Sequence, residues 1–369
     1  MMVKSKIIIF VSFLFSVLTS CVAAEKVNGT MISDIKRDEF VVFFRTSAWM
    51  SDDNQYWYIP IHGWIYEPEK STLRKALIAK SLSLKFGLEI SNATEANFER
   101  RVNLLIADNE RNKRIVVRIG ERNHVLPPSA ENGHFKHVIR LPMSEVNNTT
   151  NDGSLVYSAV TKPTDLRLFT GEVRLVTPVG LSIISDIDDT IKITQVTKHE
   201  KLFEHTFYND FTAAPGMASL YQSWADDTML HFVSSSPWQL YSPLLEFVQQ
   251  EGFPWATLSL KSVRFRDETL LNLFKKGTET KPAQIEPILT AYPKRKFILI
   301  GDSGEQDPEV YAGIARKYGS QIVKIYIRNV SGAASSDERF KQAFNELSHD
   351  QWQLFTDPAT LNLIEFVYQ

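Results

Sequence analysis

The sequence predicts an α/β domain with a parallel sheet in the C-terminal half of the chain, preceded by a β-sandwich-like region. Three observations favour this fold. The N-terminal half contains short runs of alternating apolar and polar residues, the C-terminal half alternates apolar runs with helical segments, and Thr177-Pro178 separates the two patterns. We therefore expect a β-rich region over 25–178 and an α/β domain over 179–369.

Six runs in the N-terminal region have the length and composition of half-buried strands. They are 40–45, 57–65, 102–107, 114–119, 135–141 and 172–176. Between the second and third runs, Leu73, Leu77, Leu82 and Phe86 recur at nearly helical spacing, which predicts one helix over 71–89. Turn-forming residues such as Asn132-Gly133 separate the runs.

The C-terminal half contains five apolar runs that are followed by polar loops or helical segments. The runs are 181–185, 229–233, 256–260, 297–300 and 322–327, and helices are expected over 242–250 and 283–292. Strands that alternate with helices form parallel sheets, which bind ligands at the carboxyl ends of their strands. Polar residues follow three of the runs, so we expect a functional site there.

The first 24 residues have the pattern of a secretory signal peptide. Lys4 and Lys6 precede an apolar run over 7–18, and small residues follow up to Ala24. The run is shorter than the ~20 residues that a transmembrane helix needs. We therefore expect an exported protein without a permanent transmembrane anchor.

The chain has one cysteine, Cys21, which leaves two processing routes open. Leu18-Thr19-Ser20-Cys21 resembles the lipobox of bacterial lipoproteins, whereas Val22-Ala23-Ala24 suits ordinary signal peptidase. The expected locations are the periplasm, the membrane as an anchored lipoprotein, or the medium. A single cysteine allows no intramolecular disulfide.

The charge balance argues against nucleic acid as a partner. The formal net charge of the 369-residue chain is −2 at pH 7. A nucleic-acid-binding protein needs a strongly basic face, which this composition does not favour.

The clearest catalytic pattern is Asp186-Ile187-Asp188-Asp189-Thr190, directly after the run at 181–185. Two carboxylates at a strand end allow one to act as nucleophile and metal ligand and the other to transfer protons in phosphate ester cleavage. A divalent cation would let an anionic carboxylate approach an anionic phosphate. An EF-hand calcium loop is excluded because Ile191 and Thr197 stand where it needs glycine and glutamate. An acidic turn that caps a helix is the structural alternative.

Two further strand ends carry candidate residues. Ser234-Ser235-Ser236-Pro237 offers hydroxyls and backbone amides for a phosphoryl oxygen, although it also resembles a helix start. Asp302 is expected to complete a metal site, whereas Asp307 fits either a metal site or a helix N-cap before Pro308.

A lysine is needed to neutralise the phosphate. Lys281 opens the helix that precedes the run at 297–300, and Lys275 and Lys276 are rival candidates. A solvated surface lysine is the alternative for each.

These elements stand in the order seen in the haloacid dehalogenase superfamily of phosphohydrolases, which the chain resembles. The resemblance implies that Asp186 is the nucleophile and Asp188 the general acid and base. It implies that Ser234 and Lys281 hold phosphate, and we add Thr190 and Ser235 as expected substrate contacts. The implied ligands of Mg²⁺ are Asp186, Asp302, Asp307 and Asp188, the last through its backbone carbonyl.

Four segments are similar to the actin-patch-type phosphatidate phosphatases, whose chemistry resembles that of lipins. They are 170–175, 185–192, 234–241 and 300–309. The similarity is strong over 171–328 and looser in the N-terminal region, where it rests on a turn at Gly63-Trp64-Ile65-Tyr66 and on Asn132-Gly133-His134-Phe135. It implies magnesium-dependent hydrolysis of phosphatidate to a diacylglycerol-type product through an aspartyl-phosphate.

The gaps between the motifs are too short for a cap domain, so we expect an uncapped, open site that suits a phosphate on a membrane surface or macromolecule. Near its mouth, aromatic and basic residues fit either a lipid headgroup layer or, for the aromatics, the core. They are Trp238, Tyr241, Phe253, Trp255, Lys261, Arg264 and Arg266. His134 and His137 are expected on opposite faces of a strand, which excludes a shared zinc ion.

Three functions are compatible with these patterns. The first is a magnesium-dependent phosphatidate or lipid phosphate phosphatase that works at a phospholipid membrane surface. The second keeps the chemistry with a phosphoprotein or another phosphorylated macromolecule as substrate. The third is a non-catalytic membrane- or protein-binding module, which Asp186, Asp188, Lys281 and Asp302 argue against, because buried carboxylates repel one another without a function.

Overall fold

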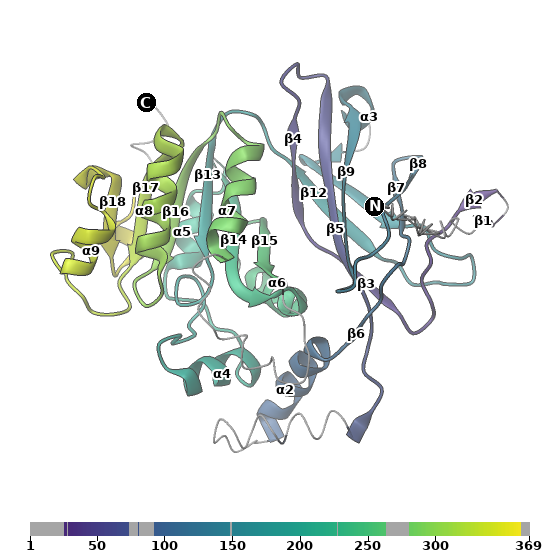
Figure 1. Ribbon diagram of the computed structural model, residues 1–369, viewed down its shortest axis with the longest axis horizontal. Helices are drawn as coiled ribbons and strands as arrows, with labels where there is room; N and C mark the ends of the chain where they lie inside the picture. Colours follow the sequence, from purple (N-terminus) through teal and green to yellow (C-terminus); the bar gives the residue numbers. More distant parts are fainter. Residues whose placement is uncertain are drawn as a thin grey trace, which may run out of the picture.

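The computed structural model describes residues 26–27, 29–73, 80, 92–147, 150–226, 228–262 and 280–362 (Figure 1). The expected signal peptide with Cys21, most of the helix expected over 71–89, and the side chains of Arg264, Arg266, Lys275 and Lys276 lie outside these residues. No helix in the described part of the chain has both the length and the apolar character needed to cross a membrane.

The N-terminal region is a β-sandwich-like arrangement, as predicted. Its strands follow the order β3-β5-β4-β12-β11-β7-β8, while β6 and β9 pair with β5, and β10 pairs with β11. The bounds are β3 Phe40–Phe43, β4 Thr46–Met50, β5 Tyr56–Glu67, β6 Asp108–Asn109, β7 Val116–Ile119, β8 Arg122–Val125, β9 His134–Pro142, β10 Thr150–Asn151, β11 Ser154–Ala159 and β12 Thr170–Leu175. β4 joins two halves of this region, one around β5 and β9 and the other around β11 and β12, because it pairs antiparallel with β5 and parallel with β12. Apolar side chains from both halves form one core between them.

Smaller elements flank this region. They are β1 Lys26–Val27, β2 Thr30–Met31, α2 Asn92–Leu105 and α3 Met143–Asn147. The first two pair only with each other among the described strands.

β5 and β9 form the longest strand pair, from Tyr56 opposite Pro142 to Trp64 opposite His134. Gly63 therefore lies within a strand, and the prediction of a turn at 63–66 is wrong. A Cβ atom at Gly63 would lie 2.3 Å from Cζ of Phe135, so cross-strand packing requires glycine there. The pairing also buries His134 and exposes His137, which points to the opposite face as predicted.

The strand predicted over 102–107 is wrong, because this segment ends helix α2. Phe98, Val102 and Leu105 recur at helical spacing and pack in the same apolar cluster as Phe203 of α4 His199–Phe207. A short apolar run fits both a strand and one buried face of a helix, and here tertiary packing favours the helix.

The C-terminal part is an α/β fold whose six strands are all parallel, in the order β15-β14-β13-β16-β17-β18. The strands are β13 Leu181–Asp186, β14 Thr228–Pro237, β15 Ala256–Lys261, β16 Lys296–Asp302, β17 Ile322–Arg328 and β18 Trp352–Phe355. The sheet confirms the predicted fold class, and all six residues of β13 are buried at its centre.

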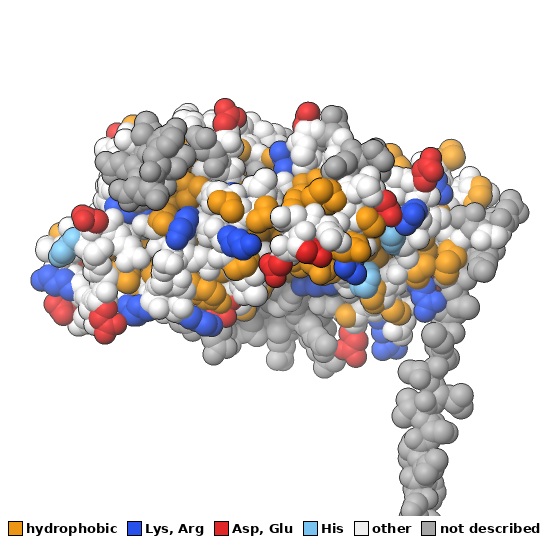
Figure 2. Space-filling view, turned by 90° about the horizontal axis from the view of Figure 1, so that it is seen from above, with side chains coloured by type: hydrophobic (Ala, Val, Ile, Leu, Met, Phe, Trp, Pro, Cys, Tyr) orange, Lys and Arg blue, Asp and Glu red, His pale blue; other side chains and the backbone are white. Residues whose placement is uncertain are grey.

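Helices cover both faces of this sheet (Figure 1). One face packs against α7 Thr280–Ala291, α8 Asp307–Tyr318 and α9 Glu338–Ala343. The other packs against α5 Met217–Ser223 and α6 Tyr241–Gln250, which η1 Trp238–Leu240 precedes, whereas α4 His199–Phe207 lies below the sheet beside α2. Between Thr190 and β14, the described residues form α4 and α5 and no strand of a separate cap. The face in Figure 2 mixes hydrophobic side chains with basic and acidic ones.

An aromatic seam joins the N-terminal region to the α/β fold. The Phe44 ring lies 4.3 Å from the Trp238 ring and 4.6 Å from the Tyr241 ring, centre to centre. The backbone N–H of Arg45 donates to the Tyr241 hydroxyl at 2.7 Å. Trp238 and Tyr241 are buried in this seam, so they belong to the core rather than to a lipid headgroup layer.

Arg295 fastens the segment between β12 and β13. Its guanidinium donates to the Thr177 carbonyl at 2.9 Å, to the Val179 carbonyl at 2.8 Å and to the Ser182 hydroxyl at 2.8 Å. It also bonds the hydroxyl of Thr177 and the carbonyl of Leu181. One side chain therefore fixes the path of the chain from one sheet to the other.

Replacing Arg295 with methionine should lower the free energy of unfolding by about 2–4 kcal/mol, because several acceptors lose their partner and two of them are buried. Urea denaturation followed by circular dichroism measures the change. Lys294→Met, at the exposed neighbouring position, is the matched control and should have little effect. Equal stability of the two variants would contradict this role of Arg295.

Candidate active site

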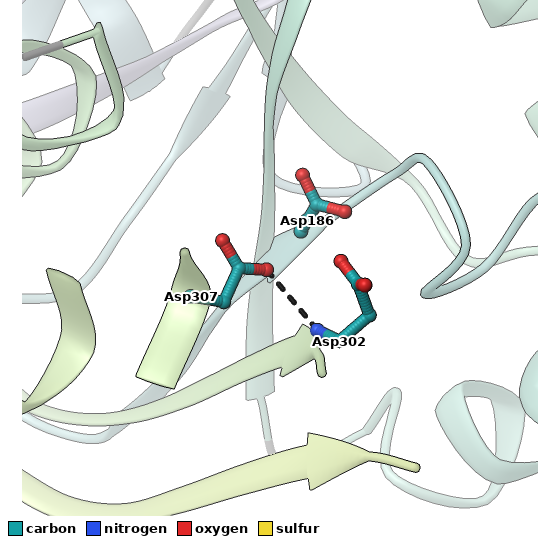
Figure 3. Close-up of side chains that lie close together, drawn as sticks. All are labelled: Asp186, Asp302 and Asp307. Carbon is teal, nitrogen blue, oxygen red and sulfur yellow. Dashed lines mark hydrogen bonds between the residues drawn. The ribbon is translucent and has the colours of Figure 1, made fainter. Parts of the chain in front are cut away.

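The parallel register of β13 and β16 brings Asp186 and Asp302 to the same edge of the sheet. Ser185 lies opposite Ile300 in this pairing, and each aspartate ends its strand. The Asp186 residue is 1% exposed and Asp302 is 0% exposed. The loop after β16 then returns Asp307, the first residue of α8, to the same place (Figure 3).

Asp186, Asp302 and Asp307 form a buried acidic cluster in which one carboxylate oxygen of each lies within 4.8 Å of the others. The Asp302 backbone N–H donates to Oδ2 of Asp307 at 3.1 Å, as Figure 3 shows. Oδ1 of Asp302 accepts from the amides of Gly304 at 2.6 Å and Glu305 at 3.1 Å. Oδ2 of Asp302 is buried and has no hydrogen-bond partner among the described residues. Three carboxylates with a free oxygen suit a hard divalent cation.

The alternative role of Asp307 as an N-cap does not hold. The N-cap of α8 is Gln306, and Asp307 is the first helical residue. The carboxylate of Asp307 bonds Asp302 and Lys281 instead.

Lys281 lies in the first turn of α7 and is buried against three carboxylates. Its ammonium nitrogen is 2.8 Å from Oδ1 of Asp186 and 3.1 Å from Oε2 of Glu305, and it also contacts Oδ1 of Asp307. Burial alone would lower the pKa of Lys281, but the carboxylates outweigh it and raise the pKa well above its usual value.

The same burial acts in the opposite direction on the acids. It raises the pKa of Asp186 and that of Asp302 well above the usual carboxyl value, although Lys281 opposes both shifts. Glu305 has a raised pKa for the same reason. One lysine faces four carboxylates, so a bound divalent cation would stabilise their ionised forms.

Asp188 lies beside this cluster in a separate set of hydrogen bonds. Its Oδ1 contacts the Lys192 ammonium at 2.8 Å and accepts from the Thr194 hydroxyl at 2.8 Å. Its Oδ2 accepts from the hydroxyls of Ser234 at 3.1 Å and Ser236 at 3.2 Å. Burial would raise the pKa of Asp188, but Lys192 and these donors outweigh it and hold the pKa below its usual value. The carboxylate of Asp188 therefore lies outside the acidic cluster.

Asp189 organises the loop that supplies two of these donors. Its φ of 55° is left-handed, and its carboxylate accepts from the amides of Thr194, Gln195 and Val196 at 2.7–2.8 Å. These bonds fold 190–196 back over the site, so that Lys192 and Thr194 reach Asp188.

The residues predicted to contact the substrate, Thr190, Ser234 and Ser235, lie at different places around the site. Thr190 donates to Oδ2 of Asp186 at 3.0 Å and so orients that carboxylate. Ser234 and Ser236 both reach Asp188, whereas Ser235 between them is half-buried. Ser236 was missed, although alternate residues on a strand share a face and this spacing would have indicated it. Lys192, Thr194 and Glu305 were also missed.

Gly301 permits the close approach of Asp307. A Cβ atom at Gly301 would lie 2.2 Å from Oδ2 of Asp307, so a larger residue would displace this carboxylate. The glycine of the Gly301-Asp302 pair is therefore required by the acidic cluster itself.

The comparisons with known proteins find a family match over 181–329. These residues match the family model described as Phosphatidate phosphatase APP1, catalytic domain. The chain is 34% identical over 181 residues to Phosphatidate phosphatase APP1 of Saccharomyces cerevisiae, covering 47% of this chain and 30% of the yeast protein. It is 30% identical over 188 residues to an uncharacterised protein of Schizosaccharomyces pombe, covering 50% of this chain and 31% of that protein. The chain thus spans less than a third of either relative's length.

Among solved structures, a β-phosphoglucomutase from Thermotoga maritima is 15% identical, with 50% of this chain and 99% of that chain covered and a TM-score of 0.30. At this TM-score the likeness carries no argument.

The prediction of export is wrong. The yeast relative is a cytoplasmic actin-patch protein, which contradicts a periplasmic, lipoprotein or secreted form. The prediction rested on two lysines, a dozen apolar residues and a few small residues, a pattern that specifies no packing partner and lies outside the described residues.

Replacing Gly301 with alanine should lower the free energy of unfolding by about 1–3 kcal/mol, because the added methyl group displaces the Asp307 carboxylate. Gly313→Ala is the matched control within α8, where a Cβ atom would meet nothing within 4 Å. It should raise the free energy of unfolding by about 0.5–1 kcal/mol. Chemical denaturation of both variants measures the difference, and a change of the same sign in both would refute the steric argument.

Proposed function

We propose, from the match of 181–329 to the family model of APP1 phosphatidate phosphatase catalytic domains, that this protein hydrolyses phosphatidate or a closely related lipid phosphate. The observation that carries the proposal is the position of Asp186, whose carboxylate contacts Lys281 on one oxygen and Thr190 on the other. A carboxylate held on both sides at the end of a parallel strand is suited to attack a phosphorus atom along a fixed direction.

In the first step, a carboxylate oxygen of Asp186 attacks the phosphorus, and the bond from phosphorus to the lipid oxygen breaks. The departing oxygen takes a proton from Asp188 and leaves as a diacylglycerol-type alcohol. In the second step, water attacks the aspartyl-phosphate and gives its proton to Asp188. Inorganic phosphate leaves, and Asp186 is regenerated.

Asp188 is suited to both proton transfers. Without substrate, Lys192 and the hydroxyl donors keep it ionised, as the base step needs. A phosphate dianion beside it raises its pKa by like-charge repulsion and favours the protonated form that the acid step needs. Ser234 and Ser236 can then turn their hydroxyl groups to the phosphoryl oxygens.

The acidic cluster fits a divalent cation, and we propose Mg²⁺ with Asp186, Asp302 and Asp307 as its carboxylate ligands. The unpartnered Oδ2 of Asp302 supports this assignment. When bound, the ion neutralises charge on the phosphoryl group and on the nucleophile.

A phosphorylated macromolecule is the second candidate substrate. The described residues between Thr190 and β14 form no separate cap over the site, and a site of this kind also admits a phosphate on a protein surface.

Phosphate release from phosphatidate in mixed micelles should require Mg²⁺ and should fall more than about a thousandfold in Asp186→Asn, because the amide cannot act as a nucleophile. Asp350→Asn changes an exposed aspartate that precedes β18 and should retain activity. Release of phosphate by Asp186→Asn at the wild-type rate would overturn the mechanism. Turnover of phosphopeptides but not of phosphatidate would transfer the proposal to the second substrate class.

The apparent affinity for Mg²⁺ should rise with pH. The pKa of Asp302 is raised in the metal-free protein, so below that pKa the ion must displace a proton. The expected rise is up to about tenfold per pH unit for each displaced proton, and it levels off above the raised pKa. Titration calorimetry from about pH 5 to about pH 8 measures it. An affinity independent of pH, equal in Asp302→Asn, would show that Asp302 is not a ligand.

A further inference from the structure

A cleft of about 890 Å³ lies between the N-terminal region and the α/β fold, apart from the acidic cluster. One wall comes from β4, β5 and β9, and the other comes from β15, Trp238 and α7. Its size falls within the range of sites that hold organic ligands, roughly 300–1,000 Å³.

One face of α7 runs along the whole cleft. The residues that line it recur at helical spacing and are mostly apolar: Thr280, Ala283, Gln284, Pro287, Ile288 and Ala291. Ile285 and Leu289 on the other face are buried against the sheet. The stripe is ~16 Å long at ~1.5 Å per residue. The opposite wall adds Ile61, Val138 and Trp49.

The cleft begins next to the residues that would hold phosphate. Thr280 at its end precedes Lys281, the lysine that contacts Asp186. The side-chain amide of Gln284 donates to the Ser234 carbonyl at 2.9 Å, and the Ser234 hydroxyl reaches Asp188. The apolar stripe therefore starts at the edge of the candidate active site and leads away from it.

The charges of the cleft favour an anionic ligand. Arg45, Lys136 and Lys261 line it, and none of its lining residues in the described part of the chain is an aspartate or glutamate. Arg45 is paired with Glu172 at 3.2 Å, whereas Lys136 is exposed and has no acidic partner among the described residues. A cleft that combines an apolar stripe with basic side chains suits a molecule that has an apolar chain and an anionic head.

We infer that this cleft binds an acyl chain of the lipid phosphate, laid along α7 while the phosphate lies at Asp186 and Lys281. This inference rests on the proposed function and assigns the substrate's apolar part to specific residues. Ala283 and Pro287 are exposed in the cleft, so their surface is free to receive methylene groups. A water-soluble phosphate ester would not use this surface.

The test compares dioctanoyl with dibutyryl phosphatidate, both dispersed as monomers so that micelle binding plays no part. Wild-type kcat/KM should be higher for the longer chains, since each methylene group that leaves water improves binding by up to about fourfold. Ala283→Trp fills the cleft near the site, and kcat/KM for dioctanoyl phosphatidate should fall at least about tenfold. The kcat/KM of this variant for dibutyryl phosphatidate should stay within about twofold of the wild-type value. Thr290→Trp, on an exposed face of α7 outside the cleft, should change neither.

Binding provides a second measurement that does not depend on turnover. In the Asp186→Asn background, calorimetry should show dioctanoyl phosphatidate binding that Ala283→Trp weakens at least about tenfold. If Ala283→Trp lowered kcat/KM and affinity equally for both lipids, or for neither, the acyl-chain site would be overturned while the proposed function stands. Hydrolysis of neither lipid by the wild-type protein would overturn both.

Discussion

The ion pairs of Lys281 are the interaction on which the candidate site depends. Buried carboxylates repel one another and lose hydration, so Asp186, Glu305 and Asp307 can lie together only with a cation among them. The same lysine joins β13, the loop after β16 and the first turn of α7. Its contacts therefore fix the geometry of the strand ends, and the negative charge that it leaves unbalanced is what the proposed divalent ion would offset.

The N-terminal region supports the end of β14 from behind. Trp238 and Tyr241 follow Ser236-Pro237 directly, and Phe44 of the N-terminal region packs against both rings. Arg45 adds a hydrogen bond to Tyr241. At this seam the described residues of the two sheets meet through aromatic rings, and elsewhere Arg100 of α2 forms an ion pair with Glu246 of α6. Beside the seam the two sheets remain apart, and this separation leaves the cleft along α7. A region that appears accessory in the sequence thus contributes to both the support and the surroundings of the site.

The sequence predicted five of the six strands of the parallel sheet, all except β18, since buried parallel strands are continuous apolar runs. The prediction failed where strand pairing or helix packing depends on residues that are distant in the sequence. β4 has no clear alternation and is held by two different partners, and 102–105 is helical because one face packs in the same apolar cluster as α4. Asp186 and Asp302 were found because each ends an apolar run. Lys192 and Thr194 were not, because they reach Asp188 only through left-handed backbone at Asp189 and Gln195, which no spacing rule indicates.

The hydrogen bonds of Arg295 limit how the chain can be divided. This residue precedes β16, deep in the α/β fold, yet its acceptors lie in the segment that leads from β12 to β13. The two regions are therefore not exchangeable modules, and one buried apolar cluster, which includes Phe44, Trp64 and Phe232, extends across both of them. A recombination event that joined a foreign β-region between β12 and β13 would also have to place backbone carbonyls within hydrogen-bond distance of the Arg295 guanidinium. Such junctions are constrained by a residue more than a hundred positions downstream.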